Sequence, residues 1–198
     1  TDGTQALLRT VTYENTRVIF QPRNMGKGTS IRTAIPHCSG DYVFIQDADF
    51  EYDPNDYPLF LNRAEQDWPA AIFGSRTLGG RAIYKYVANY WGVRLLTWMT
   101  NTLYGSRLTD VATASKMVRT DVVNRLRLTG TGFDLDFELP SKLLRVGYEI
   151  VEVPISYKPR TVEEGKKIRA WDGLWALRVI IRDRFIPTGQ VLVEQREG

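Results

Sequence analysis

The stretch Tyr42-Val43-Phe44-Ile45-Gln46-Asp47-Ala48-Asp49-Phe50-Glu51 joins an apolar run to three acidic residues. The apolar residues 42–46 predict a buried β-strand. In extended chain, residues i, i+2 and i+4 point to the same side, so we expect Asp47, Asp49 and Glu51 to share one face. Carboxylates so close repel one another unless a cation lies between them, and oxygen ligands favour Mg²⁺ or Mn²⁺. The alternative is an Asp-x-Asp pattern that arose by chance in a loop.

Short apolar strands and helices alternate on either side of this stretch, which is typical of an α/β fold with a mostly parallel sheet and helices on both faces. Strands are expected over 17–20, 42–46, 70–74 and 149–157, and helices over 28–38, 81–104, 137–146 and 171–185. The first two strands and the helix between them predict a βαβ unit.

A further helix is expected to begin at Pro54. Asp53 is a suitable N-cap, and proline is well tolerated at the first helical position. We expect the inner face of this helix to hold Leu59, Phe60 and Ala64.

The composition is that of one globular domain, with 198 residues of which 43% are hydrophobic and 25% charged. A chain of this length buries roughly 70% of the surface that its unfolded form exposes. Residues 1–187 are expected to form the domain and 188–198 a polar tail that frays. The single cysteine, Cys38, excludes an intrachain disulfide, and the single histidine, His37, argues against His-rich metal sites and a Ser-His-Asp triad.

Charge is distributed unevenly along the chain, although the net charge is only +3. Six acidic residues and no basic residue lie between Asp41 and Asp56, whereas Lys158 to Arg169 holds five basic and two acidic residues. We expect the two segments to face one anionic, metal-bound ligand. No dense Lys/Arg stripe is interleaved with aromatic residues, so no nucleic-acid partner is expected.

A second motif is the glycine-containing turn Asn24-Met25-Gly26-Lys27-Gly28-Thr29 at the start of the first expected helix. Amide groups at a helix N-terminus favour anions, and Lys27 adds a positive charge. Lys27 is therefore a candidate substrate-binding residue. The spacing is not that of a P-loop, and a plain turn is the alternative.

Two segments combine aromatic and basic residues, which is typical of helices at a membrane surface. The first holds Tyr84, Tyr86, Tyr90, Trp91, Leu95, Leu96, Trp98 and Tyr104 with Lys85 and Arg94; the second holds Trp171, Leu174, Trp175 and Ile181 with Arg178, Arg182 and Arg184. The alternative is that these aromatic residues pack in the core. No run reaches the ~18 to 20 apolar residues of a membrane span, and no signal-peptide pattern is found, so a soluble or peripheral protein is expected.

These motifs together resemble glycosyltransferase family 2, and within it the dolichyl-phosphate mannosyltransferase and polyprenyl-phosphate glycosyltransferase group. The resemblance extends from about Thr1 to Phe185. It rests on the order of Asn24-Met25-Gly26-Lys27-Gly28, Gly40-Asp41-Tyr42, Gln46-Asp47-Ala48-Asp49, Glu51-Tyr52-Asp53-Pro54, Gly74-Ser75-Arg76, Thr109-Asp110, Gly132-Phe133, Glu138-Leu139, Glu152-Val153-Pro154-Ile155-Ser156-Tyr157 and Arg160.

The resemblance implies a GT-A-like fold and a metal-dependent, inverting hexosyltransferase. The donor would be of the UDP-glucose or GDP-mannose type, the acceptor a polyprenyl phosphate, and the cofactor Mg²⁺ or Mn²⁺. Asp47, Asp49 and Glu51 are the implied metal ligands. Arg76 is implied to lie near the phosphates of donor and acceptor, and the cytoplasm or the cytoplasmic membrane face is the expected location.

The same resemblance implies that Arg160, Lys166 and Lys167 belong to a basic segment that closes over the site. The residues of this segment differ from the family's usual motif. Which of the two lysines corresponds to the lysine of that motif therefore stays open. Family members also begin with two strands that end in base-binding residues, whereas Thr1-Asp2-Gly3-Thr4 resembles the turn just after them. We therefore expect the first two strands and most of the nucleobase pocket to lie outside this sequence.

The expected chemistry places little demand on a general base. A phosphate monoester has its second pKa at about 6, so it is largely a dianion at neutral pH. Asp110 is a candidate for orienting the acceptor, or for acting as base towards a hydroxyl, and a surface cap is its alternative role. Other readings are a glycosyltransferase with a soluble acceptor and a non-catalytic nucleotide-sugar-binding domain.

Overall fold

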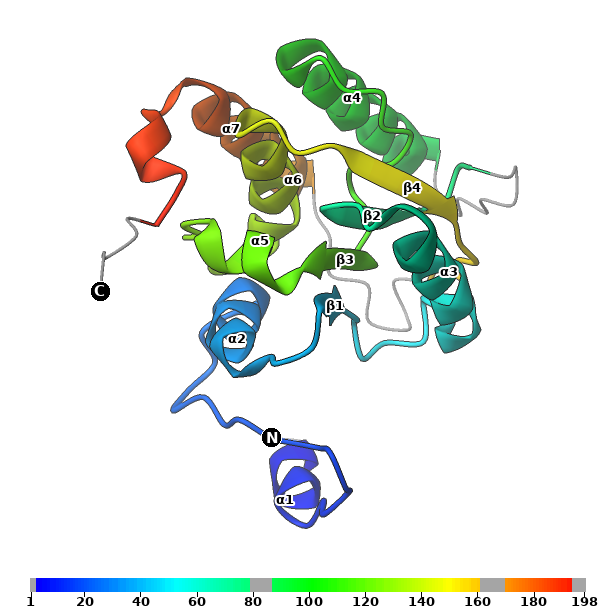
Figure 1. Cartoon of the computed structure of the whole chain (residues 1–198), viewed down its shortest axis with the longest axis vertical. Coiled ribbons are helices and arrows are strands. Elements are labelled where there is room, and N and C mark those ends of the chain that lie inside the picture. The colour runs from blue at the N-terminus through cyan, green and yellow to red at the C-terminus, as the bar shows by residue number, and fades with distance from the viewer. Residues whose placement is uncertain (1–2, 79–86, 161–169, 194–198) are drawn as a thin grey trace.

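A four-stranded sheet lies at the centre of the computed structural model, which describes residues 3–78, 87–160 and 170–193 (Figure 1). The strand order is β1 (Tyr42–Ile45), β3 (Lys116–Arg119), β2 (Ala71–Ser75) and β4 (Ile150–Pro154). β2 and β4 are parallel, whereas β3 is antiparallel to β1 and to β2. β1, β2 and β4 therefore run in one direction, as the alternating pattern predicted, and β3 runs against them.

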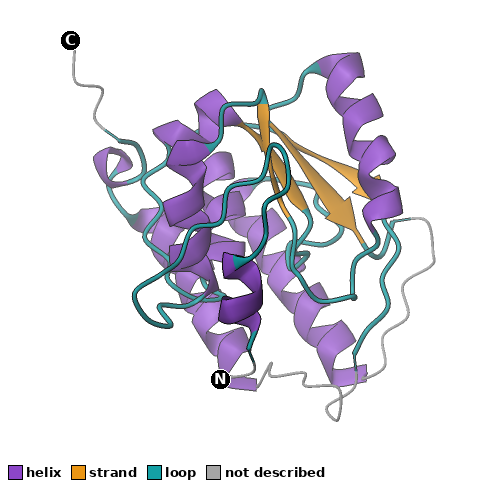
Figure 2. Cartoon of the chain, turned by 90° about the horizontal axis from the view of Figure 1, so that it is seen from below, coloured by secondary structure: helices purple, strands orange, loops and turns teal. Residues whose placement is uncertain are grey.

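Side chains alternate between the two faces of the sheet, and helices cover both (Figure 2). Ile72 of β2 packs with Phe60 and Ala64 of α3 (Tyr57–Asp67) on one face. Ala71 and Phe73 point to the other face, which is covered by α4 (Val87–Tyr104), α5 (Thr120–Arg125), α6 (Leu135–Arg145) and α7 (Ala170–Phe185). Both faces are apolar because each lies under a helical layer.

The helices predicted from the sequence are confirmed, with shifted ends. The helix expected over 28–38 is α2 (Lys27–Ala34), followed by the 3-10 turn Ile35–His37 that contains Pro36. The Asp53 side chain accepts a hydrogen bond from the Asn55 amide at 2.9 Å and so caps a second 3-10 turn, Pro54–Asp56, before α3. Leu59, expected to face inward, is 40% exposed. Residues 81–86 of the expected aromatic helix lie outside the described residues.

The strand expected over 17–20 is not formed, so the predicted βαβ unit is wrong. A strand needs a neighbour for its amide and carbonyl groups, and no described strand pairs with this segment. Ile19 and Phe20 are partly exposed, and the Arg9 guanidinium of α1 (Thr4–Arg9) lies 4.6 Å from the Phe20 ring centroid. Figure 1 shows α1 apart from the sheet.

The chain after α7 packs back onto the fold rather than fraying from Thr188. A 3-10 turn, Thr188–Gln190, is followed by the fully buried Val191 and by Leu192, which forms a β-bridge with Leu126. Burial of the apolar Val191 side chain, with Leu192 packed against the core, keeps this part of the chain in place. Residues 194–198 lie outside the described residues.

Candidate functional site

The carboxyl ends of β1, β2 and β4 meet at one edge of the sheet, which is where open α/β sheets bind ligands. The amino end of β3 lies at the same edge because this strand runs in the opposite direction. Four segments therefore converge there: 46–51, 75–77, 109–116 and 155–160. The amino end of α6 adds Asp136 through an ion pair with Lys27.

The acidic segment after β1 turns instead of continuing as a strand. The Glu51 amide donates to the Asp49 carbonyl at 2.7 Å, and this turn ends the two-residue alternation that predicted one shared face. Asp47 instead pairs with Lys27, with 2.8 Å between Oδ1 and Nζ. Among the described residues, no group of three His, Cys, Asp or Glu side chains could hold a metal ion. The expected set of three carboxylate ligands is therefore not assembled here.

Asp49 and Glu51 nevertheless converge on one positive charge. Arg160 Nη2 lies 2.5 Å from Asp49 Oδ2, and Arg160 Nε lies 3.4 Å from Glu51 Oε1. Burial and the negative charge of Glu51 raise the pKa of Asp49 against the opposing effect of Arg160. Two carboxylates that face one cation fit Mg²⁺ or Mn²⁺, because such sites commonly use one or two carboxylates together with substrate phosphates.

A second charged cluster lies between α2, β3 and α6. Lys27 Nζ is 2.8 Å from Asp47 and 3.1 Å from Asp136, and Lys116 Nζ is 3.9 Å from the other oxygen of Asp136. Lys116 is fully buried and also donates to the Thr113 carbonyl. Burial lowers the pKa of Lys116 to about 8, although Asp136 opposes this shift.

Asp136 and Lys116 were missed in the sequence. Lys116 belongs to a strand that the sequence pattern did not indicate, so nothing marked its side chain as facing the site. Asp136 follows Gly132-Phe133 within the first turn of α6, and that glycine-containing turn before a helix was the available signal.

The turn that contains Lys27 is covered by the loop 129–132. The Thr29 amide donates to the Thr131 carbonyl at 3.1 Å, and a Cβ on Gly28 would lie 2.7 Å from the Gly130 carbonyl oxygen. Gly26, with φ +86°, likewise abuts the Thr131 carbonyl. These contacts favour a turn that packs against the loop over an open anion site at its amides. Lys27 still points its charge into the site.

Glu138 of α6 binds the loop 129–132 through its carboxylate. Its fully buried carboxylate accepts hydrogen bonds from the amides of Thr129 at 2.9 Å and Gly130 at 2.6 Å, and from Lys142 Nζ at 2.6 Å. Burial alone would raise the pKa of Glu138, but these donors outweigh it and lower the pKa. Glu138 therefore remains charged and fixes the loop against α2.

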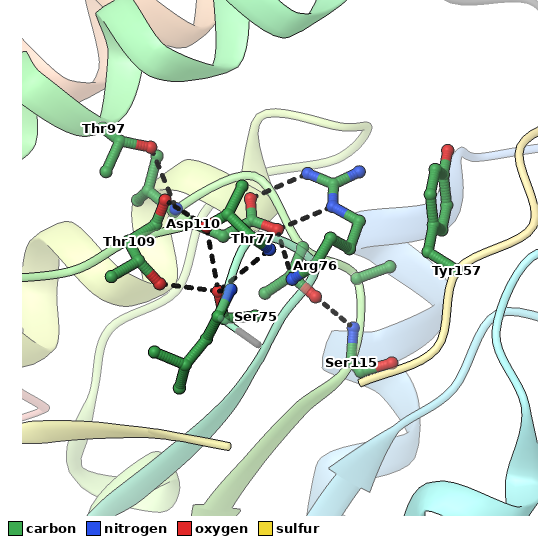
Figure 3. A network of polar contacts seen from close by, with 12 residues as sticks. Ser75, Arg76, Thr77, Thr97, Thr109, Asp110, Ser115 and Tyr157 are labelled. Atoms are coloured by element: carbon green, nitrogen blue, oxygen red, sulfur yellow. Dashed lines mark hydrogen bonds and ion pairs between the residues drawn. The ribbon is translucent and has the colours of Figure 1, made fainter. Parts of the chain in front are cut away.

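Arg76 and Asp110 form a bidentate pair behind the acidic segment (Figure 3). Arg76 Nε lies 2.6 Å from Oδ2 and Nη2 lies 2.8 Å from Oδ1, while the Arg76 amide donates to Oδ2 at 3.1 Å. Burial would raise the pKa of Asp110, but Arg76 outweighs it and lowers the pKa. Asp110 is fully buried, so a surface cap is excluded, and both of its oxygens accept from Arg76.

The pair is supported on two sides. The Glu152 carboxylate accepts from the amides of Thr109 at 2.7 Å and Asp110 at 3.0 Å, which fixes the loop that holds Asp110. On the other side, the Arg76 guanidinium lies 5.0 Å from the Tyr157 ring centroid (Figure 3). Tyr157 in turn donates its hydroxyl hydrogen to Glu51 Oε2 at 3.2 Å, which connects this pair to the acidic segment.

Of the three basic residues expected to close over the site, the structure places Arg160 beside Asp49 and Glu51. Lys166 and Lys167 lie outside the described residues. The carboxylates of Asp49 and Glu51 could bind one cation. The positive charges of Lys27 and Arg160 could bind the anionic oxygens of a ligand. Such a site is suited to a metal-bound phosphate or diphosphate.

Residues 1–127 match the family described as glycosyl transferase family 2. The low-salt glycan biosynthesis hexosyltransferase Agl6 of Haloferax volcanii is 27% identical over 159 residues, which cover 77% of this chain and 38% of that protein. The dolichyl-phosphate beta-glucosyltransferase ALG5D of Trichomonas vaginalis is 36% identical over 70 residues, which cover 33% of this chain and 21% of that protein. The matched segments therefore span well under half the length of these relatives.

The fold is similar to that of glucosyl-3-phosphoglycerate synthase from Mycobacterium tuberculosis, crystallised with Mn²⁺, UDP and phosphoglyceric acid. The TM-score is 0.62 at 14% sequence identity, over 86% of this chain and 57% of the synthase chain. The same synthase with Mg²⁺ and UDP gives a TM-score of 0.60. This likeness confirms the GT-A-like α/β fold predicted from the sequence.

Proposed function

Because the chain belongs to glycosyltransferase family 2, we propose that its protein transfers a hexose, with inversion and with a divalent cation, from a nucleotide-sugar to a polyprenyl phosphate. The observation that supports this most strongly is the convergence of Asp49 and Glu51 on one cation position, which the Arg160 guanidinium occupies here, on the same segment that holds the Lys27–Asp47 ion pair. The names of two relatives, a hexosyltransferase and a dolichyl-phosphate glucosyltransferase, agree with the proposal.

On this proposal Asp49 and Glu51 hold Mg²⁺ or Mn²⁺, with Asp47 next to them. A cation bound there would neutralise the charge of the nucleoside diphosphate as it leaves the sugar. The synthase with the similar fold was crystallised with both Mn²⁺ and UDP, and a donor of the UDP-glucose or GDP-mannose type fits the same role here. Lys27 and Arg160 bind the phosphate oxygens around the cation.

The state of Asp110 supports a phosphate acceptor over a hydroxyl acceptor. A hydroxyl acceptor needs a general base, whereas a phosphate monoester is already a nucleophile at neutral pH. Asp110 is fully buried and accepts from Arg76 through both oxygens, so it orients Arg76 and does not take a proton from an acceptor. Arg76 would then stay in place between Asp110 and the Tyr157 ring, and Lys166 and Lys167 would bind the acceptor phosphate.

Asp49→Asn tests the proposal most directly, because it removes a metal-binding charge at nearly constant volume. In the intact protein we expect calorimetric titration of UDP and GDP with Mn²⁺ to give at least about tenfold weaker binding for this variant, since an interaction with a charged group contributes about 1.5 to 3 kcal/mol. Asp53→Asn is the matched control: asparagine also caps helices, so its binding is expected to equal that of the unmodified protein.

Turnover separates the proposal from its alternatives. A panel of nucleotide-sugars is incubated with polyprenyl phosphate or with soluble acceptors, and we expect product with the lipid phosphate alone. Product with soluble acceptors only would identify a different acceptor class. Donor binding without any turnover would identify a nucleotide-sugar-binding protein, and unchanged Mn²⁺-dependent nucleotide binding in Asp49→Asn would contradict the metal assignment.

A further inference from the structure

Arg160 occupies the place between Asp49 and Glu51 that a divalent cation requires. Its guanidinium reaches Asp49 Oδ2 at 2.5 Å and Glu51 Oε1 at 3.4 Å. The Asp49 side chain is 22% exposed and that of Glu51 10%, and Glu51 also accepts from the Arg160 amide and the Tyr157 hydroxyl, so few of their oxygen lone pairs face solvent. A cation that binds these carboxylates must therefore displace the guanidinium.

The backbone around Arg160 is held independently of that guanidinium. The Lys158 amide donates to the Glu51 carbonyl at 2.9 Å, and Tyr52 and Tyr157 form a β-bridge. The Arg160 side chain is 36% exposed, which leaves room for it to rotate towards solvent. Once displaced, the guanidinium stays within a side chain's length of the cation site because the segment 157–158 remains attached to 51–52.

We propose that Arg160 exchanges between two partners: it neutralises Asp49 and Glu51 in the metal-free protein, and it binds the nucleoside diphosphate once the metal has taken its place. This proposal rests on the proposed function. Two carboxylates and one guanidinium leave a net charge of −1, whereas two carboxylates and a divalent cation are neutral. The diphosphate then adds negative charge that the released guanidinium balances, and its planar fork suits phosphate oxygens.

The exchange makes a prediction that neither a plain phosphate contact nor a structural role makes. Without nucleotide, Arg160 competes with the cation, so its removal strengthens metal binding. With a nucleoside diphosphate bound, Arg160 stabilises the complex, so its removal weakens metal binding. The effect of the substitution on Mn²⁺ affinity therefore changes sign when nucleotide is added.

The experiment measures Mn²⁺ affinity of the intact protein by electron paramagnetic resonance of free Mn²⁺ and by calorimetry, with Mn²⁺ alone and at saturating UDP or GDP. For Arg160→Gln we expect about threefold to tenfold tighter binding of Mn²⁺ alone, and about tenfold weaker binding with nucleotide. Arg119→Gln is the matched control, because Arg119 pairs with Asp121 on the exposed surface with 2.6 Å between Nη2 and Oδ2. We expect this control to leave both affinities unchanged.

Arg160→Lys extends the test, because lysine keeps the charge without the fork and is expected to restore the competition without fully restoring nucleotide-dependent binding. Circular dichroism checks the fold of each variant. An effect of the same sign in both conditions, or no effect in either, would overturn the exchange while Asp49-dependent binding of Mn²⁺ and nucleotide still supports the proposed function. Absence of any Mn²⁺-dependent nucleotide binding in the unmodified protein would instead overturn the proposed function.

Discussion

Arg76 and Asp110 are 34 residues apart in the sequence, and both are buried at the sheet edge. A buried charge is costly unless its partner and its hydrogen bonds compensate for the lost water. Three segments that are distant in the sequence meet here to provide that compensation, because Glu152 fixes the Asp110 amide and Tyr157 covers the Arg76 guanidinium. The pair therefore positions the residues around it rather than acting as a mobile acid or base.

Asp110→Asn is expected to lower the free energy of unfolding by about 3 kcal/mol or more, because it removes the negative charge of a buried, bidentate ion pair with Arg76. Asp121→Asn is the matched control. It breaks an ion pair with Arg119 of equal length, 2.6 Å, but the Asp121 side chain is 58% exposed, so we expect a loss under about 1 kcal/mol. Urea denaturation followed by circular dichroism measures both. Equal losses of unfolding free energy in the two variants would show that burial does not make the Arg76–Asp110 pair more important for stability than an exposed pair.

At the scale of elements, the sequence was sufficient to predict those strands and caps that a short local pattern determines. The apolar runs at β1, β2 and β4 and the cap at Asp53 were recognised because burial and capping are local properties. The segment 17–20 has the same apolar pattern but no described partner strand, and β3 is stabilised by pairing with both β1 and β2. Strand pairing is a property of the whole sheet, so neither outcome could be predicted from the segment alone.

The same limit applies to the candidate site. The acidic segment was located correctly after β1, but the turn at 49–51 gives Asp47 a different partner from Asp49 and Glu51. Asp136 comes from a helix about 90 residues further along the chain, and only the folded arrangement brings it to Lys27. Long-range ion pairs of this kind leave no periodic pattern in a sequence.

The contact between α2 and the loop 129–132 gives a prediction at this scale. Gly28→Ala is expected to lower the free energy of unfolding by about 1 to 3 kcal/mol, because the new Cβ would lie 2.7 Å from the Gly130 carbonyl oxygen and 2.9 Å from that of Gly132. Gly92→Ala in α4 meets no atom within 4 Å. This second substitution is expected to stabilise the protein by about 0.5 to 1 kcal/mol, since alanine favours helix interiors. Thermal unfolding of both variants checks the opposite signs, and a gain in stability for Gly28→Ala would show that the loop can move away without cost.

At the scale of the whole molecule, α4 divides its side chains between the core and the surface. Leu96, Thr97 and Thr100 are buried, whereas Trp91 and Trp98 are exposed. One side of this helix therefore packs into the fold, and the other side is exposed. No helix in the described part of the chain is long and apolar enough to cross a membrane.

The exposed side of α4 forms a stripe of four large apolar side chains at helical spacing. Val87 is 73% exposed, Trp91 65%, Leu95 54% and Trp98 62%. Arg94 lies exposed on the same helix, and in α7 the Arg178 guanidinium lies 5.2 Å from the Trp175 ring centroid. Tryptophan beside arginine is suited to the boundary between headgroups and acyl chains, and a lipid-phosphate acceptor would require the protein to work at that boundary.

We therefore expect the intact protein to bind vesicles of phosphatidylcholine with anionic phosphatidylglycerol, and Trp91→Ser with Trp98→Ser to reduce that binding about tenfold in a flotation assay, because two large apolar side chains no longer enter the bilayer. Trp68→Ser is the matched control, since Trp68 is 51% exposed at the end of α3 in the other helical layer. The double variant should keep its affinity for Mn²⁺ and nucleotide, because the stripe does not include the carboxylates proposed to hold them. Equal vesicle binding by all three proteins would exclude this stripe as the membrane contact, and loss of nucleotide binding in the double variant would show that α4 supports the site itself.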